Sequence, residues 1–311
     1  MKRIITVLTF LALAAGLKAQ QTDTVKKGTQ KETSADSLLN AMSPEDKPRE
    51  IAVFKASRLI ISPTTETVKK KNLNFLVIHR FGDIGTSTGG ARTLFGLDAI
   101  NDVYIGFEYG VSDNLNIDFG RSTIGGLIEL GLKYAVLHQK TDNSSPIAIT
   151  LLGQTGVRPY GQYTTFENRL SYLGQVIISR KFTSALSLQV SPIFVRDNTP
   201  IPDLSGNEQQ FFSLSAAGRY KVTKGMSILV DYAHPFSSFR TGANGFTDPL
   251  GFGIEEQTGG HVFTINITNS RGISEINSLS GSQASYGRGQ FRLGFTISRM
   301  FDFNRKGSGN K

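Results

Sequence analysis

The stretch GQFRLGFTISRMFDF, residues 289–303, alternates between two kinds of side chain. Successive side chains of a β-strand point to opposite faces, so this segment would present one apolar face and one mostly polar face. The apolar face consists of Phe291, Leu293, Phe295, Ile297, Phe301 and Phe303, interrupted by Arg299. The other face consists of Arg292, Gly294, Thr296, Ser298, Met300 and Asp302. The fold depends on which of these faces points inward.

The same alternation recurs along the chain after Asn72, in short segments separated by turn residues. Most of these segments have the 9–11 residues that a tilted strand needs to cross a bilayer. The twelve predicted strands span residues 73–81, 103–110, 114–120, 127–138, 146–157, 169–181, 186–196, 211–222, 226–234, 249–256, 260–268 and 290–303. The sequence therefore predicts an all-β fold.

The connections between these segments alternate between long and short. The short ones are residues 111–113, 139–145, 182–185, 223–225 and 257–259. Long loops on one rim and short turns on the other are typical of an outer-membrane barrel. An even number of strands places both ends of the barrel on the short-turn side, which faces the periplasm. We therefore expect a single antiparallel transmembrane barrel over residues 73–303.

The first 19 residues have the layout of a cleaved secretory signal peptide. Lys2 and Arg3 precede an apolar run from Ile4 to Leu17, which is too short to span a membrane. The formal net charge of the chain is +9, and removal of this segment takes away three basic residues and leaves +6. The signal predicts export and, together with the barrel, a location in the outer membrane.

Residues 20–72 form a predicted periplasmic leader, and residues 304–311 form a basic C-terminal tail. Residues 20–50 are polar and charged and have little to bury. The segment VFKASRLIIS, residues 53–62, is more apolar and fits a strand or a plug element. A thirteenth barrel strand would break the even count, so we assign this segment to the leader or to a plug.

The faces of the strands predict an inverted polarity, with apolar side chains toward lipid. The chain offers neither an amphipathic helix nor a second sheet large enough to cover so broad an apolar surface. Apolar positions include Ile105, Phe107, Ile117, Phe119, Leu130, Leu132, Ile228, Val230, Phe263 and Ile265. The alternate positions carry the charges expected in the lumen: Arg80, Glu108, Asp118, Glu129, Lys133, Arg219, Asp231 and Arg292.

The predicted lumen charges balance in sign. A pore that selects one ion sign would show a ring of like charge, whereas a balanced set favours ion pairs that fill a narrow interior. A solute pathway through these charges is the alternative. A count of twelve strands does not decide whether the interior is filled or open, because eight strands give a filled interior and sixteen or more give an open channel.

No motif for catalysis, for a cofactor or for a metal is apparent. The Gly-rich stretch 82–93 lacks the Gly-Lys-Ser/Thr of a phosphate loop, and the four histidines show no metal-ligand spacing. No basic run with interleaved aromatics suggests nucleic-acid binding. We therefore expect no enzyme, no cofactor and no nucleic-acid partner.

Two stretches carry a resemblance to a known family: NLNFLVIHRFGDI (72–84) and LFGLDAINDVYIGFEYGVSDNLNIDFGRS (94–122). The shared features are His79 to Gly82, Leu94 to Asp98, Glu108 to Gly110 and Gly120 to Ser122. The chain resembles, over roughly residues 53–303, a domain of unknown function found in outer-membrane β-barrels of Bacteroidota. The resemblance implies the barrel fold and the outer-membrane location, and it brings no active-site residues.

The sequence leaves three functions open. A narrow channel or transport-type barrel for small solutes is the leading one, with lipid and small solutes as partners. A non-conducting scaffold that docks a periplasmic or outer-membrane protein through residues 20–50 and the long loops is the second, and an outer-membrane enzyme is the third. We also expect Arg80 to pair with Asp98 or Glu108 and so to hold the 82–102 loop over the mouth.

Overall fold

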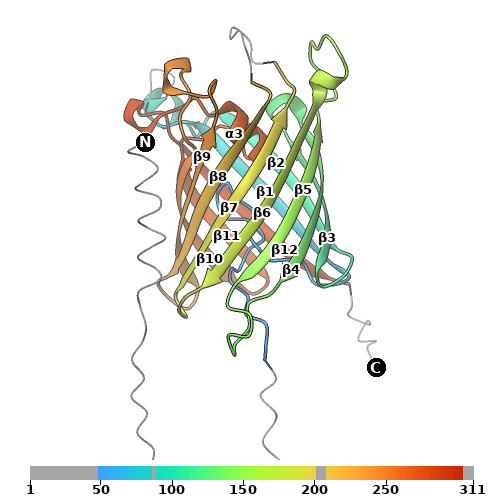
Figure 1. Cartoon of the computed structure of the whole chain (residues 1–311). Coiled ribbons are helices and arrows are strands. Elements are labelled where there is room, and N and C mark those ends of the chain that lie inside the picture. Colours follow the sequence, from blue (N-terminus) through green and yellow to red (C-terminus); the bar gives the residue numbers. More distant parts are fainter. Residues whose placement is uncertain (1–47, 86–88, 201–207, 304–311) are drawn as a thin grey trace, which may run out of the picture. The chain divides into compact units, whose positions relative to one another are not determined.

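The computed structural model describes residues 48–85, 89–200 and 208–303. In this part of the chain, twelve antiparallel strands form a closed barrel in which every strand pairs with its sequence neighbours and β1 pairs with β12 (Figure 1). The predicted leader up to residue 47, including the signal peptide, and the tail 304–311 lie outside the described residues. No helix among the described residues is long and apolar enough to cross a membrane.

The strands lie within a few residues of the predicted bounds. They are β1 Asn72–Asp83, β2 Ile100–Gly110, β3 Leu115–Ser122, β4 Ile128–Leu137, β5 Ala148–Val157, β6 Leu170–Lys181, β7 Leu186–Asp197, β8 Gln210–Lys221, β9 Met226–Phe236, β10 Leu250–Thr258, β11 His261–Thr268 and β12 Arg292–Asp302. The largest difference is at the start of β2, which begins at Ile100 because Ile100 still pairs with Phe81 of β1.

The two faces of β12 settle the polarity. Arg292, Gly294, Thr296 and Ser298 are buried in the interior, whereas the alternate residues Leu293 to Ile297 are not. The same holds around the barrel, where the exposed large apolar side chains include Ile105, Phe119, Leu132, Ile228, Ile254 and Ile265. The predicted inversion is confirmed: the outer surface is apolar, and the buried interior is rich in charged and hydroxyl side chains.

The two rims differ as the loop lengths predict. The short turns and both ends of the barrel lie on one side, since Asn72 pairs with Asp302, and the long connections lie on the other (Figure 1). The long connections contain the helix α3, Glu275–Gly281, and the 3₁₀ turns η1 Gly90–Thr93, η2 Ile124–Gly126, η3 Glu167–Arg169, η4 Gly242–Asn244 and η5 Tyr286–Arg288. Helix α3 is buried over Glu275 to Ser280 and so folds into the barrel.

A charge on the outer apolar face tests this polarity. Ile265 lies at the centre of β11 and is 60% exposed. Ile265→Arg is expected to lower the free energy of unfolding in lipid vesicles by about 2–4 kcal/mol. Phe212→Arg, near the rim end of β8, is the matched control with an expected cost of about 0–1 kcal/mol. Denaturant titration measures both, and equal costs would contradict a lipid-facing surface.

Candidate functional site

The candidate site is the lumen of the barrel. The longest chain segment inside it is residues 53–66, which we call the plug. The chain enters and leaves at the short-turn mouth. There Ile51 N–H donates to the carbonyl of Gln139 at 2.7 Å, and Lys71 N–H donates to that of Gly110 at 2.8 Å. Between these points the plug reverses direction as a hairpin, with hydrogen bonds from Leu59 N–H to the Ser62 carbonyl and from Thr64 N–H to the Ser57 carbonyl.

The apolar part of the plug explains why it enters a polar lumen. Burial of apolar side chains away from water stabilises the inserted plug. Its apolar side chains pack in one cluster with small and aliphatic residues of the wall: Val53, Phe54, Leu59, Ile60 and Ile61 against Ala148, Ala217 and Leu229. Gly251 is also required here, because a Cβ at that position would lie 2.7 Å from Cγ2 of Ile60. The wall is therefore shaped to the tip of the plug.

Asp231 of β9 holds the tip. Its Oδ2 accepts the backbone N–H groups of Ile60, Ile61 and Ser62 at 3.2, 2.7 and 2.8 Å. Its Oδ1 accepts the Ser62 hydroxyl at 2.7 Å. Both Asp231 and Ser62 are fully buried, so these charge-assisted bonds form away from water, where they are strong.

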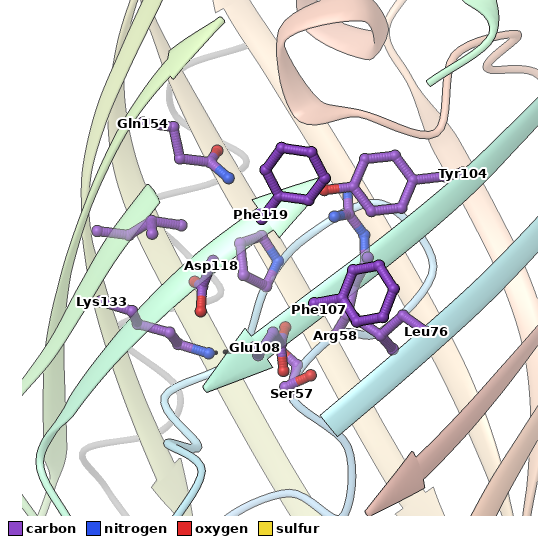
Figure 2. Close-up of a pocket in the computed structure, with 13 residues that line it drawn as sticks. Ser57, Arg58, Leu76, Tyr104, Phe107, Glu108, Asp118, Phe119, Lys133 and Gln154 are labelled. Atoms are coloured by element: carbon purple, nitrogen blue, oxygen red, sulfur yellow. Dashed lines mark hydrogen bonds between the residues drawn. The ribbon is translucent and has the colours of Figure 1, made fainter. Parts of the chain in front are cut away.

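Lys133 of β4 holds the two legs of the plug. Its Nζ donates to the carbonyl of Glu66 at 2.7 Å and to that of Ser57 at 3.4 Å. Figure 2 shows Lys133, Asp118 and Glu108, from three neighbouring strands, grouped around Ser57. The cavity that these residues line has a volume of about 20 Å³, which is room for about one water molecule. The plug thus leaves little free space beside it at this level.

A second element closes the lumen from the long-loop side, residues 270–280, which we call the inner loop. Asp102 accepts the N–H of Ile273 at 2.9 Å, and Ser274 donates its hydroxyl to Glu129 at 2.5 Å. Gln175 donates to Glu275 Oε2 at 2.6 Å. The inner loop is therefore fixed to β2, β4 and β6 by polar side chains of these strands.

Arg80 of β1 contacts both elements that close the lumen, the plug and the inner loop, which we call the two closures. Its guanidinium donates to the carbonyls of Gly272 at 2.5 Å and Ser270 at 3.3 Å in the inner loop, and to that of Ile60 at 3.4 Å in the plug. The expected pairing of Arg80 with Asp98 or Glu108 is therefore wrong. Asp98 is exposed, and Glu108 accepts instead from Asn74 at 2.8 Å.

The correction has a physical reason. A buried guanidinium has five N–H donors, and backbone carbonyls that point into the lumen can satisfy them as well as a carboxylate can. Arg80 therefore fixes the inner loop and not the 82–102 loop. The sequence gives no signal for this choice, because carbonyl acceptors are present at every residue.

The other predicted lumen charges lie in the interior. Arg219 pairs with Glu255 at 2.7 Å, and Arg292 pairs with Asp83. Glu129, Lys133 and Asp231 are buried at the closures described above, whereas Glu108 and Asp118 are half-buried. Several interior charges were not among the predicted site residues: Arg58, Glu66, Asp102, Arg158, Asp197 and Glu275. Those on strands could have been found from the alternation alone, but those on the plug and inner loop could not.

The inner loop is expected to respond to pH through Glu275. Burial raises the pKa of Glu275 to about 8, although Arg58 and the hydrogen bond from Gln175 act to lower it. The folded state therefore holds a proton that the released loop gives up at a pH near 4.5. Docking of the inner loop is strongest below a pH near 4.5 and weakens as the pH rises from there to about 8.

Hydrogen exchange of the α3 amides between pH 5 and 9, corrected for the intrinsic exchange rate, measures this effect. Protection is expected to fall by at least about tenfold across the range, since one pKa unit corresponds to a factor of ten. Glu275→Gln removes the titrating group and should give a flat profile. A wild-type profile as flat as that of the variant would contradict this role of Glu275.

The comparisons with known proteins agree with this architecture. The sequence model of one family, described as "Membrane bound beta barrel domain (DUF5777)", matches residues 54–301. The chain belongs to this family. The match includes nearly all of the plug as well as the barrel, and it confirms the expected membrane-bound β-barrel domain of unknown function. Membership agrees with the outer-membrane location predicted from the sequence.

Several solved structures are similar to this chain at low sequence identity. The NanC porin is 12% identical with a TM-score of 0.47, and the match covers 74% of this chain and 100% of the porin. The KdgM porin is 7% identical with a TM-score of 0.43, covering 75% and 99%. An outer membrane channel from Pseudomonas putida F1 is 13% identical with a TM-score of 0.45, covering 76% and 98%. A comparison with curated proteins gives no match.

Proposed function

We propose that this protein is an outer-membrane channel for small solutes that the plug and the inner loop hold closed. The observation that carries the proposal is that the plug is not part of the barrel wall. Among the described residues, all twelve strands pair with one another, and the chain before β1 adds no strand to the wall. Its backbone bonds to the barrel backbone at the rim, in an isolated bridge between Glu50 and Lys140 and at Lys71. Withdrawal of the plug therefore leaves every strand pair of the barrel intact.

The contacts inside the lumen are of a kind that can be exchanged for water. Besides its apolar tip and its contacts with charged wall groups, the plug is held by hydrogen bonds from neutral wall side chains such as Ser187, Thr150 and Gln189. Water can replace such bonds when the plug leaves, so the net free energy of each is small. A path through the barrel also requires the inner loop to move, and Arg80 links the two movements.

The lipid-facing surface and the family membership support an outer membrane as the setting, and the resemblance noted in the sequence supports an envelope of the Bacteroidota type. The filled lumen favours a second candidate, a non-conducting barrel that docks an envelope protein. These two functions differ in one measurable property, because only a channel conducts when its plug is free.

A disulfide lock separates them. The full chain contains no cysteine, and the Thr65 hydroxyl in the plug lies 2.6 Å from the Ser179 hydroxyl of β6. The double variant Thr65→Cys and Ser179→Cys replaces this hydrogen bond with a reversible covalent link. In planar-bilayer recordings, the oxidised variant should be silent, and reduction should raise the open probability by at least about tenfold.

The single variant Thr65→Cys is the matched control and should not respond to the redox state. Silence of the double variant in both redox states would favour the scaffold. Equal conductance in both states would show that the current does not pass the plug, and it would contradict the proposed closure.

A further inference from the structure

We infer that the solute bound in the lumen is an oligopeptide, which takes the place of the plug. This inference rests on the proposed channel function and adds a substrate class to it. It comes from the way in which the wall recognises the plug, which is more through the main chain of the plug than through its polar side chains.

Wall side chains donate to carbonyl groups all along the plug. The Ser187 hydroxyl donates to Val53 at 2.7 Å, Gln189 to Pro63 at 2.8 Å and the Thr150 hydroxyl to Thr65 at 2.9 Å. Lys133 and Arg80 add the carbonyls of Ser57, Glu66 and Ile60. These donors come from four strands of the wall, β1, β4, β5 and β7.

The wall also offers acceptors for amide N–H groups. Asp231 binds three successive amides of the tip, and Asn116 Oδ1 accepts the N–H of Val68, just after the plug, at 3.1 Å. By comparison, wall side chains bond to plug side chains at few points, among them Ser179 to Thr65 and Asp231 to Ser62. Every peptide carries the main-chain groups that this wall binds, whereas a sugar carries no series of amides.

The wall also has an apolar surface for side chains. Ala148, Ala217 and Leu229 line the cluster that holds the aliphatic residues of the plug tip. When the plug leaves, Asp231 and Lys133 lose their hydrogen-bond partners, and the apolar surface loses the side chains that cover it. A peptide with aliphatic residues can bind to Asp231, to Lys133 and to the apolar surface at the same time. The empty lumen is therefore a peptide-binding site that extends to the short-turn mouth.

The test measures binding of a peptide in trans to the full chain. The probe is a synthetic peptide with the sequence of residues 53–66, in which the position of Phe54 carries a tryptophan. The protein has no Trp, so tryptophan fluorescence reports the probe alone. The receptor is the full chain with Ile60→Ser and Ile61→Ser, which weakens the internal competitor and leaves the wall unchanged. Heat-modifiable migration on a gel verifies that its barrel is folded.

The probe should bind, and N-methylation of its three amides that face Asp231 should weaken binding by at least about tenfold, since hydrogen bonds to charged groups are the stronger ones. Lys133→Met in the receptor should weaken binding to a similar extent. Lys221→Met, at an exposed lysine at the end of β8, is the matched control and should have no effect. A neutral trisaccharide should not displace the probe.

Displacement by the trisaccharide, or binding that neither N-methylation nor Lys133→Met changes, would overturn the peptide assignment. Absence of probe binding, while the reduced disulfide variant conducts, would also overturn it and leave the channel in place. Absence of both binding and conductance would remove the channel proposal as well.

Discussion

Replacement of Arg80 by alanine is expected to loosen the plug and the inner loop together. Arg80 is fully buried and donates to carbonyls of both elements. Alanine leaves the carbonyls of Ser270 and Ile60 without this donor in a site that excludes water, whereas the Gly272 carbonyl keeps the hydrogen bond from the Ser270 hydroxyl at 2.9 Å. Each unsatisfied buried group costs about 1–3 kcal/mol. We therefore expect a loss of about 3 kcal/mol or more, shared between the two closures.

Hydrogen exchange separates the contributions of the two elements. Protection of the amides at residues 59–62 and at residues 272–278 should fall in parallel, by at least about tenfold in each segment, since half of about 3 kcal/mol corresponds to about a factor of ten. The open probability in planar bilayers should rise. Arg121→Ala is the matched control, because Arg121 is exposed on β3 and bonds to Tyr160 outside the lumen. Loss of protection in only one of the two segments would show that Arg80 does not couple them.

Asp231→Ala is expected to release the tip of the plug with little change in the inner loop. The substitution removes the acceptor of three backbone N–H groups and of one hydroxyl at once. Hydrogen bonds to a charged group contribute about 1.5–3 kcal/mol each, but they are not additive, so we expect a total of about 3–5 kcal/mol. That is comparable to the cost of leaving one partner of a buried ionic contact alone.

The measurement is proteolysis after Arg58 in the plug, which is half-buried and donates to the Ile273 carbonyl of the inner loop at 2.6 Å in the intact protein. Trypsin should cleave there at least about a hundredfold faster in Asp231→Ala, while the barrel keeps its heat-modifiable migration. Asp231→Asn keeps the shape and one acceptor and should give an intermediate rate. Cleavage of Asp231→Ala at the wild-type rate would show that Asp231 does not hold the plug.

The barrel could be predicted because its two strongest signals are local. The alternation seen in β12 depends only on neighbouring residues, and the parity of the connections depends only on their order. Even the exclusion of residues 53–62 from the wall follows from the requirement for an even number of strands. The lumen charges on strands, such as Arg219 and Asp231, share the alternation and could be named for the same reason.

The closures could not be predicted, because they depend on contacts between residues far apart in sequence and on backbone atoms. Asp231 meets the amides of a segment about 170 residues earlier. From its sequence, the inner loop would be assigned as a solvent-exposed loop, because Glu275, Asn277 and Ser278 are polar. In the structure, all three are buried. In an inverted barrel, polarity no longer distinguishes a loop in water from a loop inside the protein.

The hairpin shape of the plug has a mechanical consequence. Both legs leave through the same mouth, so extraction threads no chain end through the barrel. Tension applied before Ile51 would load the contacts of the first leg one after another, as in unzipping, beginning with the Ile51 bond at the rim and ending at the tip. A pull on the periplasmic side would therefore meet a series of small forces, whereas pressure from the outer side would load all contacts in parallel.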